Sequence, residues 1–164
     1  MLAIKTILHP TDFSERSDLA FDLACSLARD YGAHLIVMHV AEPPMPIYGN
    51  GLVLSPPQSS KEPLQAKLRQ LLPQDSKVQV EHRLVEGDAA IEILRVAGTA
   101  KCDLIVIGTH GRTGLGRLLM GSVAEQVLRR ASCPVLTVKT PQGQASSSDE
   151  PVTTAGGERE ARHN

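Results

Sequence analysis

Short apolar runs along this chain alternate with longer segments of helical spacing. Apolar runs at residues 4–9, 34–40, 104–107 and 134–138 predict strands, and the nearly continuous run at 34–40 is typical of a strand buried on both faces. Residues 78–84 alternate between apolar and polar positions, which indicates an edge strand with one wetter face. The pattern therefore predicts five strands, of which the third lies at an edge.

The segments between the strands have helical character. Leucine and alanine recur at helical spacing between Ser14, a residue type that caps helices, and Gly32, which supplies a stop. Gly87 and Asp88 precede another helical pattern that Gly98 stops. Further helices are expected at residues 64–72 and 122–131, and the proline-rich stretch 41–60 is expected to be a long loop.

Alternating strands and helices predict an α/β fold with a parallel sheet. Right-handed crossovers in a doubly wound, Rossmann-like layout give a five-stranded sheet of order 3-2-1-4-5. In that order strands one and four are neighbours at the topological switch point. The turn formed by Pro10, Thr11 and Asp12 then faces the glycine-rich residues 108–121 across the crevice where such sheets bind ligands.

A single domain over residues 1–140 is expected, followed by a tail. Residues 141–164 are rich in Ser, Thr, Gly, Gln and charge, and Val152 is their only large aliphatic residue. Such a segment buries too little apolar surface to offset its ordering entropy, so it is predicted to be disordered.

Composition narrows the function. The net charge of −1 argues against a general polyanion binder, and an aromatic content of 2% leaves few rings for stacking bases, so no nucleic-acid partner is expected. No apolar run approaches the roughly 20 residues of a membrane span, and the N-terminal residues lack a secretory layout, so a cytoplasmic protein without a membrane partner is expected. Cys25, Cys102 and Cys133 are widely spaced, which favours buried apolar thiols over a disulfide framework or a zinc site.

The glycine-rich residues 108–121 follow a strand and precede a helix. Glycines let backbone amides approach an anion, and the helix N-terminus supplies free N–H groups, so a phosphate site is predicted here. The dinucleotide fingerprint G-x-G-x-x-G fails, because Leu119 stands where its last glycine would be. The P-loop pattern nearly fits residues 116–122, but its lysine is missing, which makes a fast P-loop NTPase an unfavourable interpretation.

A third pattern fits: Gly108-x2-Gly111-x9-Gly121-Ser122, a G-x2-G-x9-G-[ST] motif. Together with the residues Pro10 to Ser14 after strand one and the His39-Val40 pair ending strand two, it resembles the universal stress protein family, over about residues 2–139. The resemblance implies the sheet order given above, an adenine nucleotide alpha hydrolase-like fold, and an ATP site, with Mg²⁺ as a companion of the phosphates. It also implies a homodimer through antiparallel pairing of the last strand, Val135–Val138.

The resemblance also implies a set of binding residues. Asp12 would contact the ribose or the adenine, with Pro10 and the backbone of Thr11 and Val40 beside it. The residues that would line the phosphates are Gly108, Gly111, Arg112, Gly121, Ser122 and Val123.

Several of these residues have other interpretations. Ser122 and Glu125 have the spacing of a capping box, in which the serine serves the helix, and Asp12 could cap the first helix. His9 and His39 end neighbouring strands, but no third ligand at metal spacing is evident, so packing is favoured and no metal site is predicted. No catalytic residue is named, because the chain shows no nucleophile paired with a base.

The sequence thus predicts an ATP-binding sensor or regulatory module. Two alternatives stay open. One is an enzyme that cleaves ATP, at most slowly. The other is a scaffold that acts through protein contacts and binds no nucleotide.

Overall fold

The computed structural model describes residues 3–42, 47–49, 52–54, 61–109 and 120–139 of the chain. The strands are β1 (Thr6–Pro10), β2 (His34–Ala41), β3 (Ile47–Gly49), β4 (Leu52–Leu54), β5 (Val80–Glu86), β6 (Leu104–Gly108) and β7 (Val135–Val138). The helices are α1 (Glu15–Tyr31), α2 (Lys61–Arg69), α3 (Ala89–Thr99) and α4 (Ser122–Arg130).

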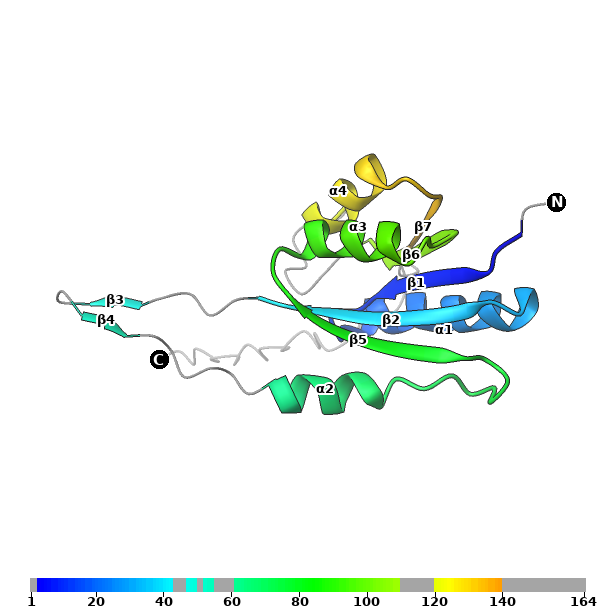
Figure 1. Cartoon of the computed structure of the whole chain (residues 1–164), viewed down its shortest axis with the longest axis horizontal. Helices are drawn as coiled ribbons and strands as arrows, with labels where there is room; N and C mark the ends of the chain where they lie inside the picture. Colours follow the sequence, from blue (N-terminus) through cyan, green and yellow to red (C-terminus); the bar gives the residue numbers. More distant parts are fainter. Residues whose placement is uncertain (1–2, 43–46, 50–51, 55–60, 110–119, 140–164) are drawn as a thin grey trace, which may run out of the picture.

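The main sheet has five strands in the order β5-β2-β1-β6-β7, and every neighbouring pair is parallel (Figure 1). In order of appearance this is the predicted 3-2-1-4-5 arrangement. Strand β5, which carries the alternating pattern, lies at one edge as predicted, and β7 lies at the other. The doubly wound prediction is confirmed.

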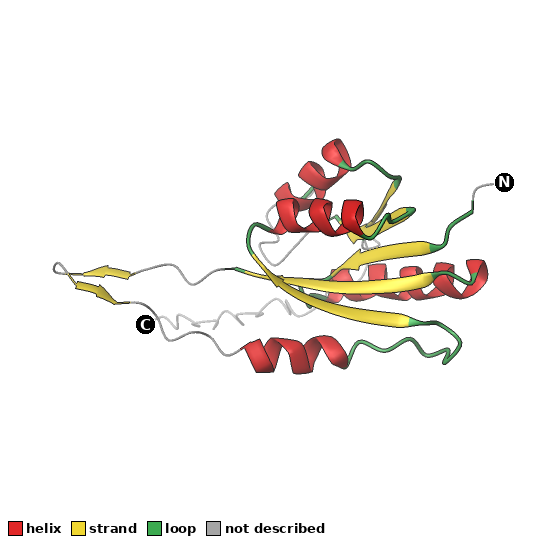
Figure 2. Ribbon diagram, in the orientation of Figure 1, coloured by secondary structure: helices red, strands yellow, loops and turns green. Residues whose placement is uncertain are grey.

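Helices cover both faces of the sheet (Figure 2). Side chains of alternate strand residues point to opposite faces, so Ile7 packs with α1 and α2 while Leu8 packs with α3 and α4. Both core halves are almost entirely aliphatic, as the low aromatic content requires.

Helix α1 begins and ends at the residues that the sequence predicted. Ser14 is its N-cap and accepts a hydrogen bond from the backbone N–H of Ser17 at 3.3 Å. Gly32 follows the last residue in the left-handed conformation, with φ of 62°, which glycine adopts at little cost.

The stretch expected to be a long loop contains an antiparallel hairpin. Strand β3 pairs with β4, with Gly49 opposite Leu52. The sequence between the two strands is Asn50-Gly51, and Asn-Gly is a strong short-range hairpin signal, but the prolines on both sides of this stretch favoured the prediction of a loop. The hairpin extends away from the main sheet (Figure 1).

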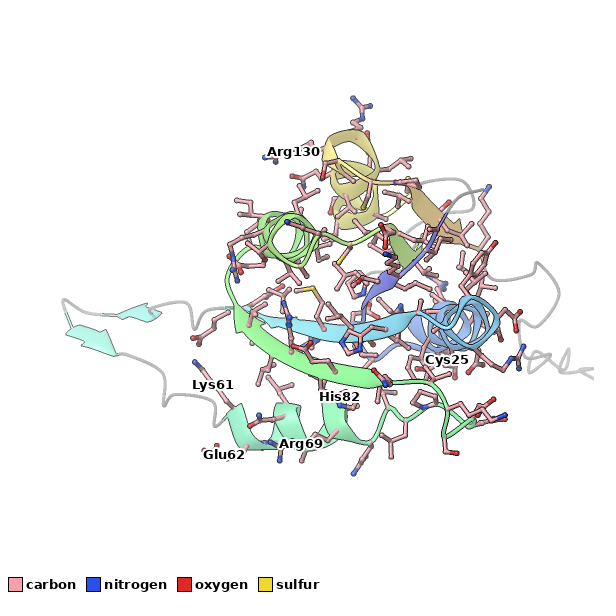
Figure 3. All side chains as sticks on the ribbon, turned by 45° about the vertical axis from the view of Figure 1, so that its right-hand side comes forward. Cys25, Lys61, Glu62, Arg69, His82 and Arg130 are labelled. Atoms are coloured by element: carbon pink, nitrogen blue, oxygen red, sulfur yellow. The ribbon has the colours of Figure 1, made fainter. Side chains whose placement is uncertain are left out.

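Helix α2 lies three residues earlier than predicted, since it runs from Lys61 to Arg69 rather than over residues 64–72. The chain beyond it is held by β5: His82 Nε2 donates to the backbone oxygen of Leu71 at 2.9 Å, and Figure 3 shows His82 between β5 and α2. Leu68, only 1% exposed, fixes α2 in the core. Among the described residues no helix is long and apolar enough to span a membrane.

The domain boundary at residue 140 and the expected disorder of residues 141–164 stay predictions. Residues 140–164 lie outside the described part of the chain.

Candidate functional site

The turn between β1 and α1 forms one wall of a cleft at the carboxyl ends of the strands. The Thr11 hydroxyl accepts hydrogen bonds from the Phe13 N–H at 3.0 Å and from the Ser17 hydroxyl at 2.9 Å. Asp12 Oδ1 accepts from the Ser14 N–H at 3.1 Å and from the Ser14 hydroxyl at 2.6 Å. The carboxylate is thus fixed by the residue that caps α1, while Asp12 itself does not cap the helix.

The second oxygen of Asp12 is unpaired. Asp12 Oδ2 is buried and has no hydrogen-bond partner among the described residues. A buried carboxylate oxygen without a donor is costly, so this atom is suited to a donor that a ligand brings. A sugar hydroxyl is such a donor.

The opposite wall is formed where β6 ends and α4 begins. Gly108 ends β6 at a point of close approach to α1: a Cβ there would lie 3.2 Å from the backbone oxygen of Arg16. The Thr109 N–H donates to the Val138 oxygen at 3.0 Å, and the Gly121 N–H donates to the Thr109 oxygen. These bonds hold the two ends of the glycine-rich loop side by side.

The N-terminus of α4 lies in this wall without a capping side chain. Gly121 is the N-cap and Ser122 is the first helical residue, so the capping-box interpretation of Ser122 and Glu125 is wrong. Because glycine offers no side-chain oxygen, the first N–H groups of α4 are left for another acceptor. A helix N-terminus of this kind favours an anion.

The two walls enclose a cleft of about 480 Å³. Eight of the ten predicted binding residues line it: Pro10, Thr11, Asp12, Val40, Gly108, Gly121, Ser122 and Val123. The other two, Gly111 and Arg112, lie outside the described residues. The turn after β1, the end of β2 and the two ends of the β6–α4 loop, which are far apart in the sequence, therefore meet at the switch point. Ligands of open α/β sheets bind at this point.

His39 also lines the cleft, although it was expected only to pack. Its Nδ1 donates to the backbone oxygen of Thr11 at 2.8 Å, and its ring lies 4.4 Å from the Phe13 ring, centroid to centroid. The sequence could have predicted this position, because His39 stands beside the predicted binding residue Val40 at the end of a strand that neighbours β1. Leu64, Ile93 and Glu42 are among the other lining residues that were not predicted.

His9 precedes the cleft residue Pro10 on β1 and is fully buried. Its Nδ1 donates to the Val106 oxygen at 3.0 Å, and its Nε2 has no partner among the described residues. Burial lowers the pKa of His9 to about 4, against the opposing effects of the Val106 bond and of Asp12. His9 is therefore neutral at pH 7, and no group of residues suited to a metal ion occurs in the part of the chain described.

The cysteines offer no activated thiol. Burial raises the pKa of Cys25 and of Cys102 to about 11, and it raises the pKa of Cys133 as well. All three are free, Cys102 is buried, and the other two are partly covered. Such thiols are poor nucleophiles at neutral pH.

A larger hollow, about 740 Å³, lies between α1 and residues 72–78. Cys25 and Arg29 line it, and Figure 3 shows Cys25 on α1. The smaller cleft is the candidate site, because Asp12 Oδ2, which is buried and has no partner among the described residues, and the N-terminus of α4 both lie there.

The structure is that of an α/β protein with a cleft at the switch point of its parallel sheet. Comparison with known proteins gives the family: the model of the universal stress protein family matches residues 3–139, and the chain belongs to that family. It is 37% identical over 144 residues to universal stress protein MJ0531 of Methanocaldococcus jannaschii, covering 84% of each chain. It is 33% identical over 140 residues to a universal stress protein of Thermus aquaticus, covering 82% of this chain and 98% of the relative.

Solved structures agree with the fold. A universal stress protein in complex with cAMP is similar with a TM-score of 0.63 and 28% identity, covering 84% of this chain and 98% of its own. A universal stress family protein from Burkholderia pseudomallei is similar with a TM-score of 0.63 and 29% identity, covering 83% and 96%.

Proposed function

We propose that this protein binds ATP in the cleft between the β1–α1 turn and the β6–α4 loop, and acts as a regulatory module that reports on nucleotide. The observation that carries the proposal is one cleft with a buried, unpaired carboxylate oxygen on one wall and an uncapped helix N-terminus on the other. The first matches a sugar hydroxyl and the second matches phosphate. An adenine nucleotide carries both groups in one molecule.

In this proposal each wall has its own task. A ribose hydroxyl donates to Asp12 Oδ2, and the base lies against the backbone of Thr11 and Val40. The phosphates accept hydrogen bonds from the N–H groups of Ser122 and Val123 at the end of α4, and the helix dipole favours their charge.

Four more residues complete the proposed phosphate site. Gly108 and Gly121 let the loop backbone approach, and Gly111 and Arg112 belong to the same site, with Arg112 as a cation for the phosphates. Mg²⁺ bound to the phosphates would offset part of their charge.

Support for an adenine nucleotide also comes from the family. A solved relative with 28% identity is a complex with cAMP, which shares the adenine and the ribose with ATP. A sensor role is proposed rather than rapid turnover, because the described residues of the cleft include no activated nucleophile. A cytoplasmic location, where ATP is made and used, belongs to the same proposal.

The test is thermal unfolding with and without Mg-ATP, on the wild type and on Gly121→Val. At a hundred times its dissociation constant, ATP should stabilise the wild type by about 2.7 kcal/mol. Gly121→Val should fold and lose this response, because its side chain enters the loop where phosphate is expected. Gly98→Val is the matched control: Gly98 lies on α3 with open space around its Cβ position, so the control should keep the ATP response.

Two results would count against the proposal. A wild type that does not respond to ATP would favour the scaffold alternative. A Gly121→Val variant that responds like the wild type would place the nucleotide elsewhere.

A homodimer through β7 is proposed as well. Among the described strands, β7 pairs only with β6, so its other edge is open, and Leu136 on it is 38% exposed. Open edges are normally paired or covered, and antiparallel pairing with a second copy would bury this edge on a twofold axis.

A further inference from the structure

Phe13, next to Asp12, has an unusual backbone conformation. Its φ is +62°, in the left-handed region that large side chains rarely adopt. Phe13 is one of two non-glycine residues with positive φ in the described part of the chain. The same residue follows the carboxylate that the proposed site depends on.

The left-handed backbone at Phe13 orients the Asp12 carboxylate. With Phe13 in this conformation, the N–H of Ser14 turns back toward Asp12 and donates to Oδ1 at 3.1 Å, and the Ser14 hydroxyl donates at 2.6 Å. Both bonds hold Oδ1, so the other oxygen, Oδ2, has a fixed direction, and it has no partner in the part of the chain that the structure describes. A right-handed residue at position 13 would redirect the Ser14 N–H and release the carboxylate.

The Phe13 ring is held from two sides. Its centroid lies 4.4 Å from the His39 ring centroid, with 38° between the planes. The ammonium of Lys67 on α2 lies 4.6 Å from the same centroid. His39 is itself tied to the turn, because its Nδ1 donates to the Thr11 oxygen at 2.8 Å. Aromatic and cation–π contacts of this kind offset the unfavourable backbone conformation.

We propose that Phe13 is a positioning residue for nucleotide binding: its left-handed backbone, clamped through the ring by His39 and Lys67, holds the Asp12 carboxylate in the cleft. The inference rests on the proposed nucleotide site. It assigns the contacts of the Phe13 ring with His39 and Lys67 a role in nucleotide affinity, beyond the packing of α2 against the turn.

The test compares Phe13→Ala with Phe13→Asn by calorimetric titration with Mg-ATP. Both variants lose the ring, but asparagine adopts the left-handed region far more readily than alanine. Phe13→Ala should weaken ATP binding about tenfold, equivalent to about 1.4 kcal/mol, and Phe13→Asn should bind more tightly than Phe13→Ala. Chemical unfolding of each variant, measured alongside, reports the loss of packing separately.

A second measurement asks whether Phe13 acts through Asp12. In the Asp12→Ala background, Phe13→Ala should cause little further loss of affinity, because the carboxylate that it positions is gone. Equal affinities of Phe13→Ala and Phe13→Asn, or a full additional loss in the Asp12→Ala background, would overturn the inference while leaving the nucleotide site intact. A wild type that binds no ATP would instead overturn the proposed function itself.

Discussion

Acidification is expected to destabilise the protein through His9. The side chain is completely buried and neutral in the fold, and burial lowers its pKa from 6.5 to about 4. The unfolded chain, whose His9 has an ordinary pKa, therefore binds a proton between these two values that the folded chain does not bind. Stability is fully present above pH 6.5 and falls as the pH drops toward 4.

The pKa difference sets the size of the effect. Each pKa unit corresponds to about 1.4 kcal/mol, so lowering the pKa from 6.5 to about 4 costs about 3 kcal/mol in all. Of this, about 2 kcal/mol is lost between about pH 7.5 and about pH 5, a range in which most carboxylates stay ionised.

The assay is urea unfolding at several pH values across that range, on the wild type and on His9→Asn. The asparagine amide can replace Nδ1 as donor to Val106, and it does not titrate. The variant should be less stable at pH 7 but should lose less stability on acidification. His82→Gln, which removes a partly buried histidine and can keep its bond to Leu71, is the control and should retain the wild-type pH dependence.

If the wild type and His9→Asn lose stability equally on acidification, the assigned protonation of His9 is wrong. Should His9→Asn not fold, the ring nitrogen signals of His9 in the wild type, followed by NMR across the same range, decide the point directly. A pKa near 6.5 would contradict the account.

Three further results are expected. Gly32→Ala should destabilise the fold by about 1 kcal/mol in urea unfolding, because Gly32 follows α1 with a φ of +62°, which alanine adopts only with strain. The space around its Cβ position is open, so a clash would not contribute, and an unchanged stability would refute the strain argument. Leu68→Ala should cost about 3 kcal/mol, since this side chain is only 1% exposed and anchors α2, and a loss below about 1 kcal/mol would show that α2 is not docked as described. Leu136→Asp should convert the proposed dimer to a monomer in light scattering, because a charge on the open edge of β7 opposes pairing; an unchanged mass would place the interface elsewhere.

The sheet order was accessible from the sequence because apolar runs and helical spacing alternate cleanly, and right-handed crossovers leave few arrangements. The alternating pattern of β5 already marked it as an edge strand. This order brings the turn after β1 opposite the loop after β6, and the individual binding residues were predicted from the resemblance to the universal stress protein family. Gly111 and Arg112 stay predictions.

Features that depend on the exact path of the backbone could not be predicted from the sequence. Ser122 has the residue type and spacing of a capping residue, yet the helix starts one residue earlier in the turn, with Gly121 as its cap. Phenylalanine rarely has a positive φ, so the conformation of Phe13, whose ring contacts His39 and Lys67, could not be predicted from the residue type. The role of His39 in the cleft was missed because a histidine at a strand end is usually assigned to packing.

The central claim is that the cleft at the switch point binds ATP with Asp12 as a contact. Calorimetric titration of the wild type and of Asp12→Ala with Mg-ATP tests it most directly. One site per chain is expected in the wild type and clearly weaker binding in the variant, with both proteins folded. No binding to the wild type, or equal binding to both, would contradict it.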